Sequence, residues 1–480
     1  MKLLSLDKKF YFICISVILF LVLVFQYILI SKGFYSISAD ESGHIWEAFC
    51  WYRGKGSIFS IWLPFQKILY GLSFHLYFDL FLIPRILSSL FGIMTVYFII
   101  KLAYELFQNQ IIAVLTGFLA AIFYPTVIFS VLPLTEIYFF FFTISSLAFY
   151  FQWRNDQRNR SLWLSIILMS LNTTTRYEAW FFALSLGLML YYQLNTSRIK
   201  SKYIHLFLAV LVLAGFPIFW IYLSKIETNE LSGFIRSVSS RYTAGDYFSE
   251  LKNNVIPDFL SMNINSLNII GFISLCFGYK KFAKVKEYVF LFAFTLLLFA
   301  VMTFLSKAMP TNNAWRLASI WSLLLLPFTA NWLNDLLINE SISPMNKLNF
   351  GAFIFLLVLF FTTQTIQYSN SSYTTDEDLK VGKIIQELLD LNKMDMVYIE
   401  PNGLKYSNIT IASQSPDRFS TESIFKYKND SLIIDMNTLA NLKNKNIKYA
   451  LFNPKTKIKI MSMEITELKK FNQWIVYKIL

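Results

Sequence analysis

The sequence predicts an α-helical membrane protein that crosses the bilayer about eleven times and ends in a small α/β domain. Of the 480 residues, 55% are hydrophobic and only 15% are charged, whereas ordinary soluble domains have about 45–50% apolar and about 25% charged residues. Long apolar runs follow one another from residue 10 to residue 367. From about residue 370 onward the chain is polar, with short runs typical of strands. We therefore expect bilayer and water to serve as solvents for different parts of the chain.

The first apolar run extends from Phe10 to Ile30 and follows Lys8 and Lys9. As a helix it would be roughly 31 Å long, which matches the hydrocarbon core of a bilayer. A signal peptide is the alternative for such an N-terminus. Its apolar region is normally ~7–15 residues long and is followed by a small-residue cleavage site, and neither feature is present. We therefore expect this run to be a transmembrane helix.

Further apolar runs of comparable length predict the other spans. They lie at about 83–104, 111–131, 134–152, 161–175, 178–194, 203–223, 264–279, 288–305, 314–337 and 349–367.

Basic residues next to the span ends predict the orientation. They form three clusters: Arg154, Arg158 and Arg160; Arg198, Lys200 and Lys202; and Lys280, Lys281, Lys284 and Lys286. With a cytoplasmic N-terminus and eleven crossings, every cluster faces the cytoplasm. That side then carries 15 basic and 6 acidic residues. The formal net charge of +13 therefore reflects positive-inside asymmetry facing anionic membrane lipids, and we expect no nucleic-acid partner. The protein is expected in the cytoplasmic membrane.

Two domains are expected. The transmembrane domain covers 1–369 and includes a first outer loop at 31–80, and a soluble extracytoplasmic α/β domain covers 370–480. A polar segment, Ser369–Thr375, is the expected linker between them. A helical pattern follows at Leu379–Leu391. Expected strands lie at 396–399, 431–435, 449–452 and 474–479.

Acidic residues in or near a bilayer are costly, so each is a functional hypothesis. Asp40 and Glu41 stand ten residues after the first span, in Ser38-Ala-Asp-Glu-Ser-Gly-His44. A carboxylate just outside the membrane can be partly desolvated and become a better base. The alternative is that Asp40 is the N-cap of a helix beginning near Ser42.

Three more charged sites lie at span ends on the same side of the membrane. Glu136 opens the fourth span, and its alternative role is a first-turn acid that complements the helix dipole. Arg176 and Glu178 lie between two spans, where they could form a structural ion pair. Arg316 begins a late span, where it could be a snorkelling anchor.

The placement of these residues on one membrane face suits a single class of reaction. Arginine forks bind a lipid-borne phosphate, which is the leaving group. A carboxylate takes the proton from an incoming hydroxyl, and further carboxylates could hold a divalent cation on the phosphate. The three cysteines and three histidines are scattered and predict neither a disulfide framework nor a metal site.

The outer stretch 45–78 is aromatic and amphipathic and contains Trp46, Trp51 and Trp62. Anchoring at the membrane interface is its expected role. Sugar stacking or contact with a lipid tail is the alternative.

The order of these motifs resembles the polytopic GT-C glycosyltransferases, such as the protein O-mannosyltransferases and the lipid A aminoarabinose transferase. The matching pieces are, in order, Asp40-Glu41 with His44, Trp62-Leu-Pro64, Arg85, Pro133-Leu-Thr-Glu136, Arg176-Tyr-Glu178 and Trp315-Arg316. The α/β tail is also similar to those of many prokaryotic members.

The resemblance implies a GT-C fold and transfer of a sugar from a polyprenyl-phosphate donor to a glycan, lipid or protein acceptor, in the cell envelope and with inversion. It implies that Asp40 is the catalytic base or the acid that positions the acceptor, and that Glu41 stands beside it. It implies that Arg176, Glu178 and Arg316, together with His44 and Arg85, line the donor site. Glu136 would be a second acidic site, which with Asp40 would hold a divalent cation if one is used.

Two alternatives remain open at the level of sequence. Within the same class, a ligase or polymerase would use a longer lipid-linked glycan. A transporter or flippase belongs to a different class and is typically built from internal repeats with polar residues at the centre of the membrane. The sequence contains no evident repeat, and the span centres are almost free of charge.

Overall fold

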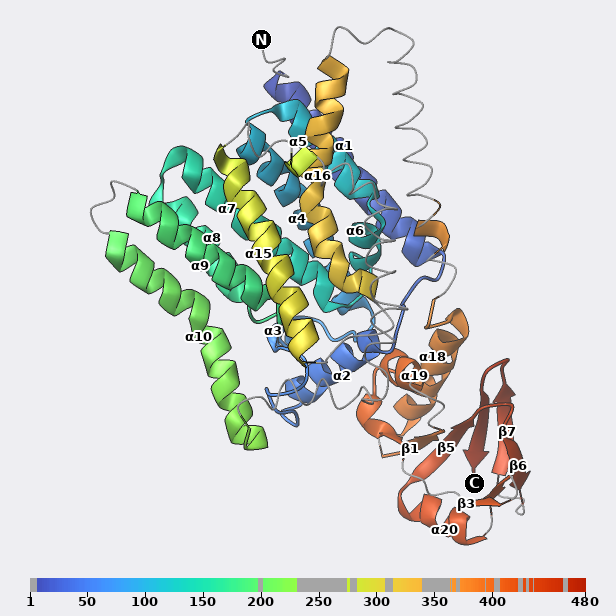
Figure 1. Cartoon of the computed structure of the whole chain (residues 1–480). Coiled ribbons are helices and arrows are strands. Elements are labelled where there is room, and N and C mark those ends of the chain that lie inside the picture. The colour runs from blue at the N-terminus through green and yellow to red at the C-terminus, as the bar shows by residue number, and fades with distance from the viewer. Residues whose placement is uncertain are drawn as a thin grey trace. The chain divides into compact units, whose positions relative to one another are not determined.

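The computed structural model is dominated by helices (Figure 1). It describes residues 7–196, 202–230, 274–276, 283–306, 314–338, 363, 365–367, 372–392, 394–400, 406–421, 426–428, 431–434, 436–460 and 465–480.

The chain forms two compact units, and each combines segments that are distant in sequence. Unit 1 consists of Met1–Ile28, Ser57–Ile68 and Ile86–Gln367, and unit 2 consists of Leu29–Gly56, Leu69–Arg85 and Tyr368–Leu480. Parts of the expected outer loop 31–80 thus belong with the C-terminal segment. The domain boundary at 369/370 stays a prediction.

The helices that lie wholly or mostly in unit 1 correspond to the expected apolar runs. They are α1 (Lys8–Ser31), α4 (Leu82–Phe107), α5 (Gln110–Ile122), α6 (Tyr124–Phe129), α7 (Thr135–Asp156), α8 (Asn159–Asn172), α9 (Glu178–Thr196), α10 (Lys202–Thr228), α15 (Ala283–Ser306) and α16 (Ala314–Ile338).

The expected span at 111–131 is divided into α5 and α6. Phe123 between them has an extended backbone, and Pro125 lies in the first turn of α6. A proline has no N–H to donate, so it fits a helix start but would interrupt the middle of a helix. The break therefore follows from the position of Pro125.

Three of the described helices, α1, α4 and α10, are long and apolar enough to cross a membrane. The expected spans at 264–279 and 349–367 lie mostly outside the described residues. The number of eleven spans stays a prediction.

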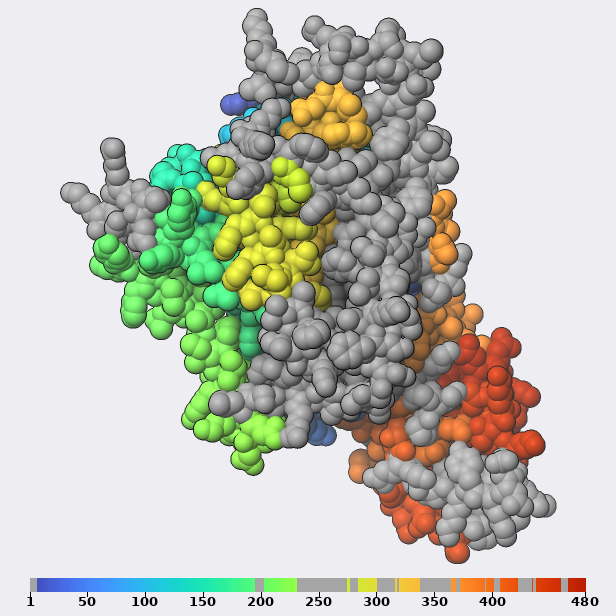
Figure 2. Space-filling view, in the orientation of Figure 1, coloured from blue at the N-terminus to red at the C-terminus, as the bar shows by residue number. Residues whose placement is uncertain are grey.

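Helix α10 has the exposed apolar face that a lipid-facing helix needs. Figure 2 shows its side chains, in green, at the surface of the molecule. The exposed residues recur four or seven positions apart along one face: Tyr203, Phe207, Leu211, Ile218, Tyr222 and Ile226. Trp220, on the opposite face, is fully buried. This pattern fits a helix between protein and lipid.

Helices α7 and α8 run side by side (Figure 1), and small polar side chains connect them. Ser146 Oγ donates to the carbonyl oxygen of Ser165 at 2.8 Å. Asn172 Nδ2 donates to Thr143 Oγ1 at 2.7 Å. Small residues allow close packing between membrane helices, where polar groups must find partners within the protein. These bonds join the middle of α7 to α8.

Unit 2 contains the short helix α2 (Asp40–Tyr52) and residues 69–76 of α3 (Phe65–Leu76). Its C-terminal elements are α18 (Asp376–Leu391), β1 (Met396–Ile399), α19 (Tyr406–Ala412), η2 (Pro416–Arg418), β2 (Phe419–Ser420), β3 (Lys426–Lys428), β4 (Ser431–Ile434), α20 (Met436–Asn444), β5 (Ile447–Phe452), β6 (Lys457–Ile460), β7 (Ile465–Lys470) and β8 (Ile475–Ile479).

The expected α/β character of the tail is confirmed. Five strands form a mixed sheet in the order β2-β1-β5-β8-β7, in which β1 is parallel to β2 and β5. A second sheet has the order β3-β4-β6. Helix α18 starts with a capping box between Thr375 and Asp378. Its buried residues Val381, Ile385 and Leu389 share a core with β1 and β5.

The described part of the expected linker, residues 372–375, is hydrogen-bonded within unit 2. Ser36 Oγ lies 2.6 Å from Thr374 Oγ1, and the backbone N–H of Tyr373 donates to the carbonyl oxygen of Ser36 at 2.8 Å. The N–H of Tyr35 donates to Ser372 Oγ at 3.1 Å. The chain after α1 is thereby joined directly to the start of α18.

Gly382→Ala tests the close packing of α18 on α19. A Cβ at this position would overlap Cβ of Ala412 and lie 3.0 Å from the carbonyl oxygen of Ile409. We expect a loss of about 1–3 kcal/mol, because the two backbones must separate. Hydrogen exchange of α18 amides in the intact protein measures the local opening free energy. Lys383→Ala, at an exposed position of the same helix, is the control, and equal exchange in both variants would contradict the prediction.

Candidate functional site

A buried cluster of two carboxylates and two guanidinium groups lies in unit 1. It consists of Glu136, Arg176, Glu178 and Arg316, and we call it the arginine–carboxylate cluster. Glu136 Oε1 accepts hydrogen bonds from Arg176 Nη1 at 2.8 Å and from Arg316 Nε at 2.6 Å. Only 1% of the Glu136 side chain is exposed, against 17% for Arg176 and 10% for Arg316. The carboxylate therefore lies beneath the two arginines.

Arg176 is bound on a second side by Glu178. Its Nε donates to Glu178 Oε2 at 3.2 Å and its Nη2 donates to Glu178 Oε1 at 2.9 Å. This two-point geometry fixes the plane of the guanidinium group. Nη1 also donates to Thr135 Oγ1 at 3.1 Å. Each part of the Arg176 fork thus has a defined partner.

Helix termini bring the cluster together. Glu136 is the second residue of α7, where the positive end of the helix dipole stabilises a carboxylate. Glu178 is the first residue of α9, and Arg316 lies in the first turn of α16. The chain between α8 and α9 turns through Thr173, Thr174 and Thr175, whose hydroxyls all bond backward to the end of α8.

The charges of the cluster balance, with two formal positive and two formal negative groups. Burial alone would lower the pKa of Arg176, but the carboxylates of Glu178 and Glu136 outweigh it and raise the pKa above its ordinary value. The guanidinium group therefore stays charged at every physiological pH. A charged group can be kept this deep only because it is paired and hydrogen-bonded.

The turn that carries Arg176 is held by aromatic residues. Trp220 Nε1 of α10 donates to the hydroxyl oxygen of Tyr177 at 3.2 Å, and Trp180 Nε1 donates to the carbonyl oxygen of Thr173 at 2.9 Å. The ring of Phe59 lies 5.2 Å from that of Trp220. Burial raises the pKa of Tyr177 to about 12, so its hydroxyl stays protonated.

In unit 2, the carboxylate of Glu41 closes a turn. Oε1 accepts from the backbone N–H of Ile37 at 2.7 Å. Oε2 accepts from Ser38 Oγ at 2.8 Å and from the Ser38 N–H at 3.2 Å. With 2% of its surface exposed, Glu41 holds the chain where it enters α2. These bonds give it a structural role beside Asp40.

Asp40 is the first residue of α2 and is partly exposed. The alternative in which Asp40 is the N-cap of a helix starting near Ser42 is wrong, because Ala39 is the N-cap and lacks a side-chain bond. Turn formation around Glu41 starts the helix two residues earlier than expected. His44, on the same helix, is buried with 4% of its surface exposed.

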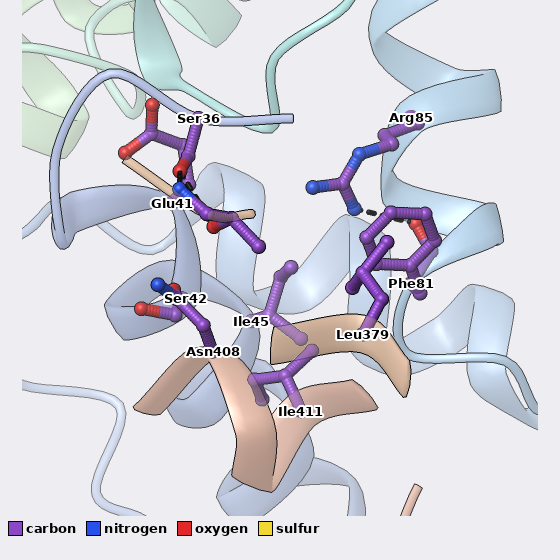
Figure 3. A pocket seen from close by; sticks show the side chains of 10 residues that line it. Ser36, Glu41, Ser42, Ile45, Phe81, Arg85, Leu379, Asn408 and Ile411 are labelled. Carbon is purple, nitrogen blue, oxygen red and sulfur yellow. Dashed lines mark hydrogen bonds between the residues drawn. The ribbon is translucent and has the colours of Figure 1, made fainter. Parts of the chain in front are cut away.

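Arg85 binds backbone carbonyls in unit 2. Nη1 donates to the carbonyl oxygen of Phe81 at 2.7 Å, and Nη2 donates to that of Tyr35 at 2.8 Å. The guanidinium group also lies beside the Phe81 ring (Figure 3). Its carbon is 3.6 Å from the ring centroid. Together with Glu41 and Asn408, Arg85 lines a small cavity. The structure thus places Arg85 in a role that fastens the segment after α1.

The two arginines oppose the binding of a divalent cation at Glu136 Oε1. Oε1 of Glu136 is bound by two guanidinium groups, whose charges oppose a cation at the same oxygen. Among the described residues, no group of three or more His, Cys, Asp or Glu side chains could hold a metal ion.

The structure therefore separates the predicted site residues into two sets. Glu136, Arg176, Glu178 and Arg316 meet in unit 1, while Asp40, Glu41, His44 and Arg85 lie in unit 2. The predicted first-turn position of Glu136 and the Arg176–Glu178 ion pair are both present. The snorkelling alternative for Arg316 is wrong, because this side chain turns inward to Glu136.

Sequence reasoning missed the residues that hold the cluster in place. Thr135 precedes Glu136 directly and its hydroxyl accepts from Arg176. Tyr177 stands between Arg176 and Glu178, but its partner Trp220 is 43 residues away. Tyr177 could have been suspected from its position between two charged residues, whereas nothing in the local pattern distinguishes Trp220 from its apolar neighbours.

Comparison with known proteins confirms the resemblance that the motifs predict. Residues 77–229 match the family model of dolichyl-phosphate-mannose-protein mannosyltransferase. The structure is similar to ArnT from Cupriavidus metallidurans bound to undecaprenyl phosphate, with a TM-score of 0.60, 14% identity and 98% of each chain covered.

It is also similar to the archaeal oligosaccharyltransferase AglB from Archaeoglobus fulgidus in complex with an inhibitory peptide and a dolichol-phosphate. There the TM-score is 0.51 and the identity 11%, with 91% of this chain and 69% of that chain covered. No curated protein matches the sequence. At these identities the structural similarities establish the fold, which is the predicted GT-C type.

Tyr177→Phe tests how the Arg176 turn is held. The variant leaves the fully buried indole N–H of Trp220 without the hydroxyl that accepts its hydrogen bond. We expect a loss of about 1–3 kcal/mol in the free energy of unfolding, measured by thermal unfolding in detergent. Tyr191→Phe, at an exposed position of α9, removes a hydroxyl without this effect. Equal unfolding midpoints for the two variants would show that the bond contributes nothing.

Proposed function

We propose that this protein is a membrane glycosyltransferase that moves one sugar from a polyprenyl phosphate to an acceptor hydroxyl at the extracytoplasmic face. The observation that carries the proposal is the arginine–carboxylate cluster. Three of its members, Glu136, Arg176 and Glu178, fall within the residues that match the mannosyltransferase family model. Buried arginines with fixed planes are the groups that bind phosphate oxygens best.

The fold supports the same class of donor. The similar ArnT structure holds undecaprenyl phosphate, and the similar AglB structure holds a dolichol-phosphate. Both ligands are polyprenol lipids that end in a phosphate. A sugar attached to such a phosphate is the donor we propose here, and the acceptor is a glycan, a lipid or a protein.

The proposed reaction is a single displacement. The carboxylate of Asp40 takes the proton from the acceptor hydroxyl, and the oxygen attacks the anomeric carbon of the sugar. The bond between that carbon and the phosphate oxygen breaks, and the configuration is inverted. The released polyprenyl phosphate gains one negative charge, which Arg176 and Arg316 stabilise.

Asp40→Asn is expected to abolish transfer, because an amide cannot take the proton. Folding and donor binding should persist, since the variant keeps the shape of the side chain. Purified protein is assayed for glycosyl product and released lipid phosphate with radiolabelled polyprenyl-phosphate sugars, with and without chelator. Glu47→Gln, on the same helix, is the matched control and should retain activity.

Full activity of a well-folded Asp40→Asn variant would exclude Asp40 as the base. Loss of activity with chelator would show that a divalent cation takes part. Product formation only with a lipid-linked oligosaccharide would indicate a ligase. Substrate movement into vesicles without any glycosyl product would indicate a transporter.

We also propose that the N-terminus lies in the cytoplasm and the C-terminal segment outside. Cysteines introduced at Gln157 and Lys478 into a variant whose three cysteines are replaced by serine should then react on opposite sides. A membrane-impermeant maleimide should label Lys478→Cys in intact cells and Gln157→Cys only after lysis. Labelling of both positions in intact cells, or of neither, would contradict this topology.

A further inference from the structure

We infer that Glu136 is a positioning residue that holds the guanidinium groups of Arg176 and Arg316 together as one anion-binding pair and itself touches neither substrate nor metal. The inference deepens the proposed function and rests on it, because the anion it assigns to the pair is the phosphate of the polyprenyl donor.

The first argument comes from geometry. Two arginines from different elements, one before α9 and one in α16, donate to the same oxygen of Glu136. Two guanidinium groups that close to each other repel, and the repulsion is strong where water is scarce. A shared carboxylate oxygen is what allows both to remain there. Glu136 is therefore the link between Arg176 and Arg316.

The second argument comes from burial. Glu136 has 1% of its side chain exposed, whereas both arginines are more exposed. A ligand that approaches the cluster meets the guanidinium groups before it meets the carboxylate. A carboxylate bound by two cations is also a weak base, because both stabilise its ionised form. These facts favour a supporting role over proton transfer.

The third argument comes from the hydrogen-bond partners of the two carboxylates. Arg176 has its own carboxylate, Glu178, which binds it at two points. Glu136 binds Arg176 and Arg316 through Oε1 alone, and its Oε2 is buried without a hydrogen-bond partner in the described part of the chain. Glu178 alone could neutralise the charge of Arg176, so Glu136 is not needed for that purpose. Glu136 is needed to hold Arg176 and Arg316 together.

Two possible roles of Glu136, balancing charge and positioning the arginines, predict opposite changes in phosphate affinity when its carboxylate is removed. Glu136→Gln changes the formal charge of the four-residue cluster from zero to +1, so charge alone would tighten binding of a phosphate. If Glu136 instead positions the pair, its loss lets the two guanidinium groups separate, and binding weakens. Whether the affinity for the phosphate rises or falls therefore decides between an effect of charge alone and a positioning role.

The experiment compares Glu136→Gln, Glu136→Asp and a control, Glu287→Gln, in the purified full-length protein. Glu287 is a suitable control because it also accepts hydrogen bonds from an arginine: Arg154 Nη2 lies 2.8 Å from its Oε1, and Tyr150 and Gln193 donate to it as well. It shares no residue with the cluster. Its loss should lower stability without changing donor affinity.

In Glu136→Gln we expect the KM for the donor and the Kd for undecaprenyl phosphate to rise about tenfold or more. We expect kcat at saturating donor to fall as well, because the same arginine pair stabilises the charge that forms on the phosphate. Glu136→Asp keeps the charge and should restore part of the affinity. Glu287→Gln should keep both constants near the wild-type values.

Tighter or unchanged binding in Glu136→Gln would overturn the inference. A fall in kcat with unchanged KM would also overturn it, because Glu136 would then act in the chemical step. If wild-type protein does not bind undecaprenyl phosphate, the proposed donor fails, and the same series is measured with inorganic pyrophosphate. Weaker pyrophosphate binding in Glu136→Gln would then support the positioning role, and equal binding or no binding by the wild type would overturn it.

Discussion

The carboxylate of Glu136 lies among apolar helices with two guanidinium groups on one of its oxygens, and the arrangement of unit 1 around it depends on this contact. Desolvating such charges is expensive, and the cost is offset only when the partners are close and well oriented. The start of α7, the turn before α9 and the first turn of α16 must therefore keep their places together. Removing one partner would leave an uncompensated charge, which typically costs about 3–5 kcal/mol. The packing of these three helix ends and the chemistry of the cluster therefore depend on the same contacts.

The surrounding residues show how the bundle meets that requirement. Small polar side chains join the middle of α7 to α8. The hydrogen bond from Trp220 to Tyr177 fastens the turn from the side of α10, whose outer face carries exposed apolar side chains. One face of α10 therefore suits lipid while the other supports the charged cluster. One helix can face lipid on one side and support a buried polar site on the other, because residues three or four positions apart lie on the same face.

Much of this arrangement could be predicted from the sequence, and the limits have physical causes. Charged residues stand out against apolar runs, so Glu136, Arg176 and Glu178 were identified and do meet. Arg316 was also identified, but a sequence does not show whether a side chain at a span end turns toward water or inward. The use of both Glu41 oxygens by Ile37 and Ser38 depends on the backbone angles of a turn. The support from Trp220 depends on the packing of α10, which no local pattern encodes.

The bonds between Ser36 and Thr374 have a consequence for biogenesis. A ribosome releases the first of these residues long before the second, so the segment after α1 must wait for most of the polypeptide before unit 2 can be completed. Contacts of such large sequence separation form late and slowly. During that interval, the partly assembled unit would expose apolar surface and be prone to misassembly. Chains that end before α18 should for this reason fold poorly, even when their membrane helices have inserted correctly. Quality-control proteases should degrade them readily.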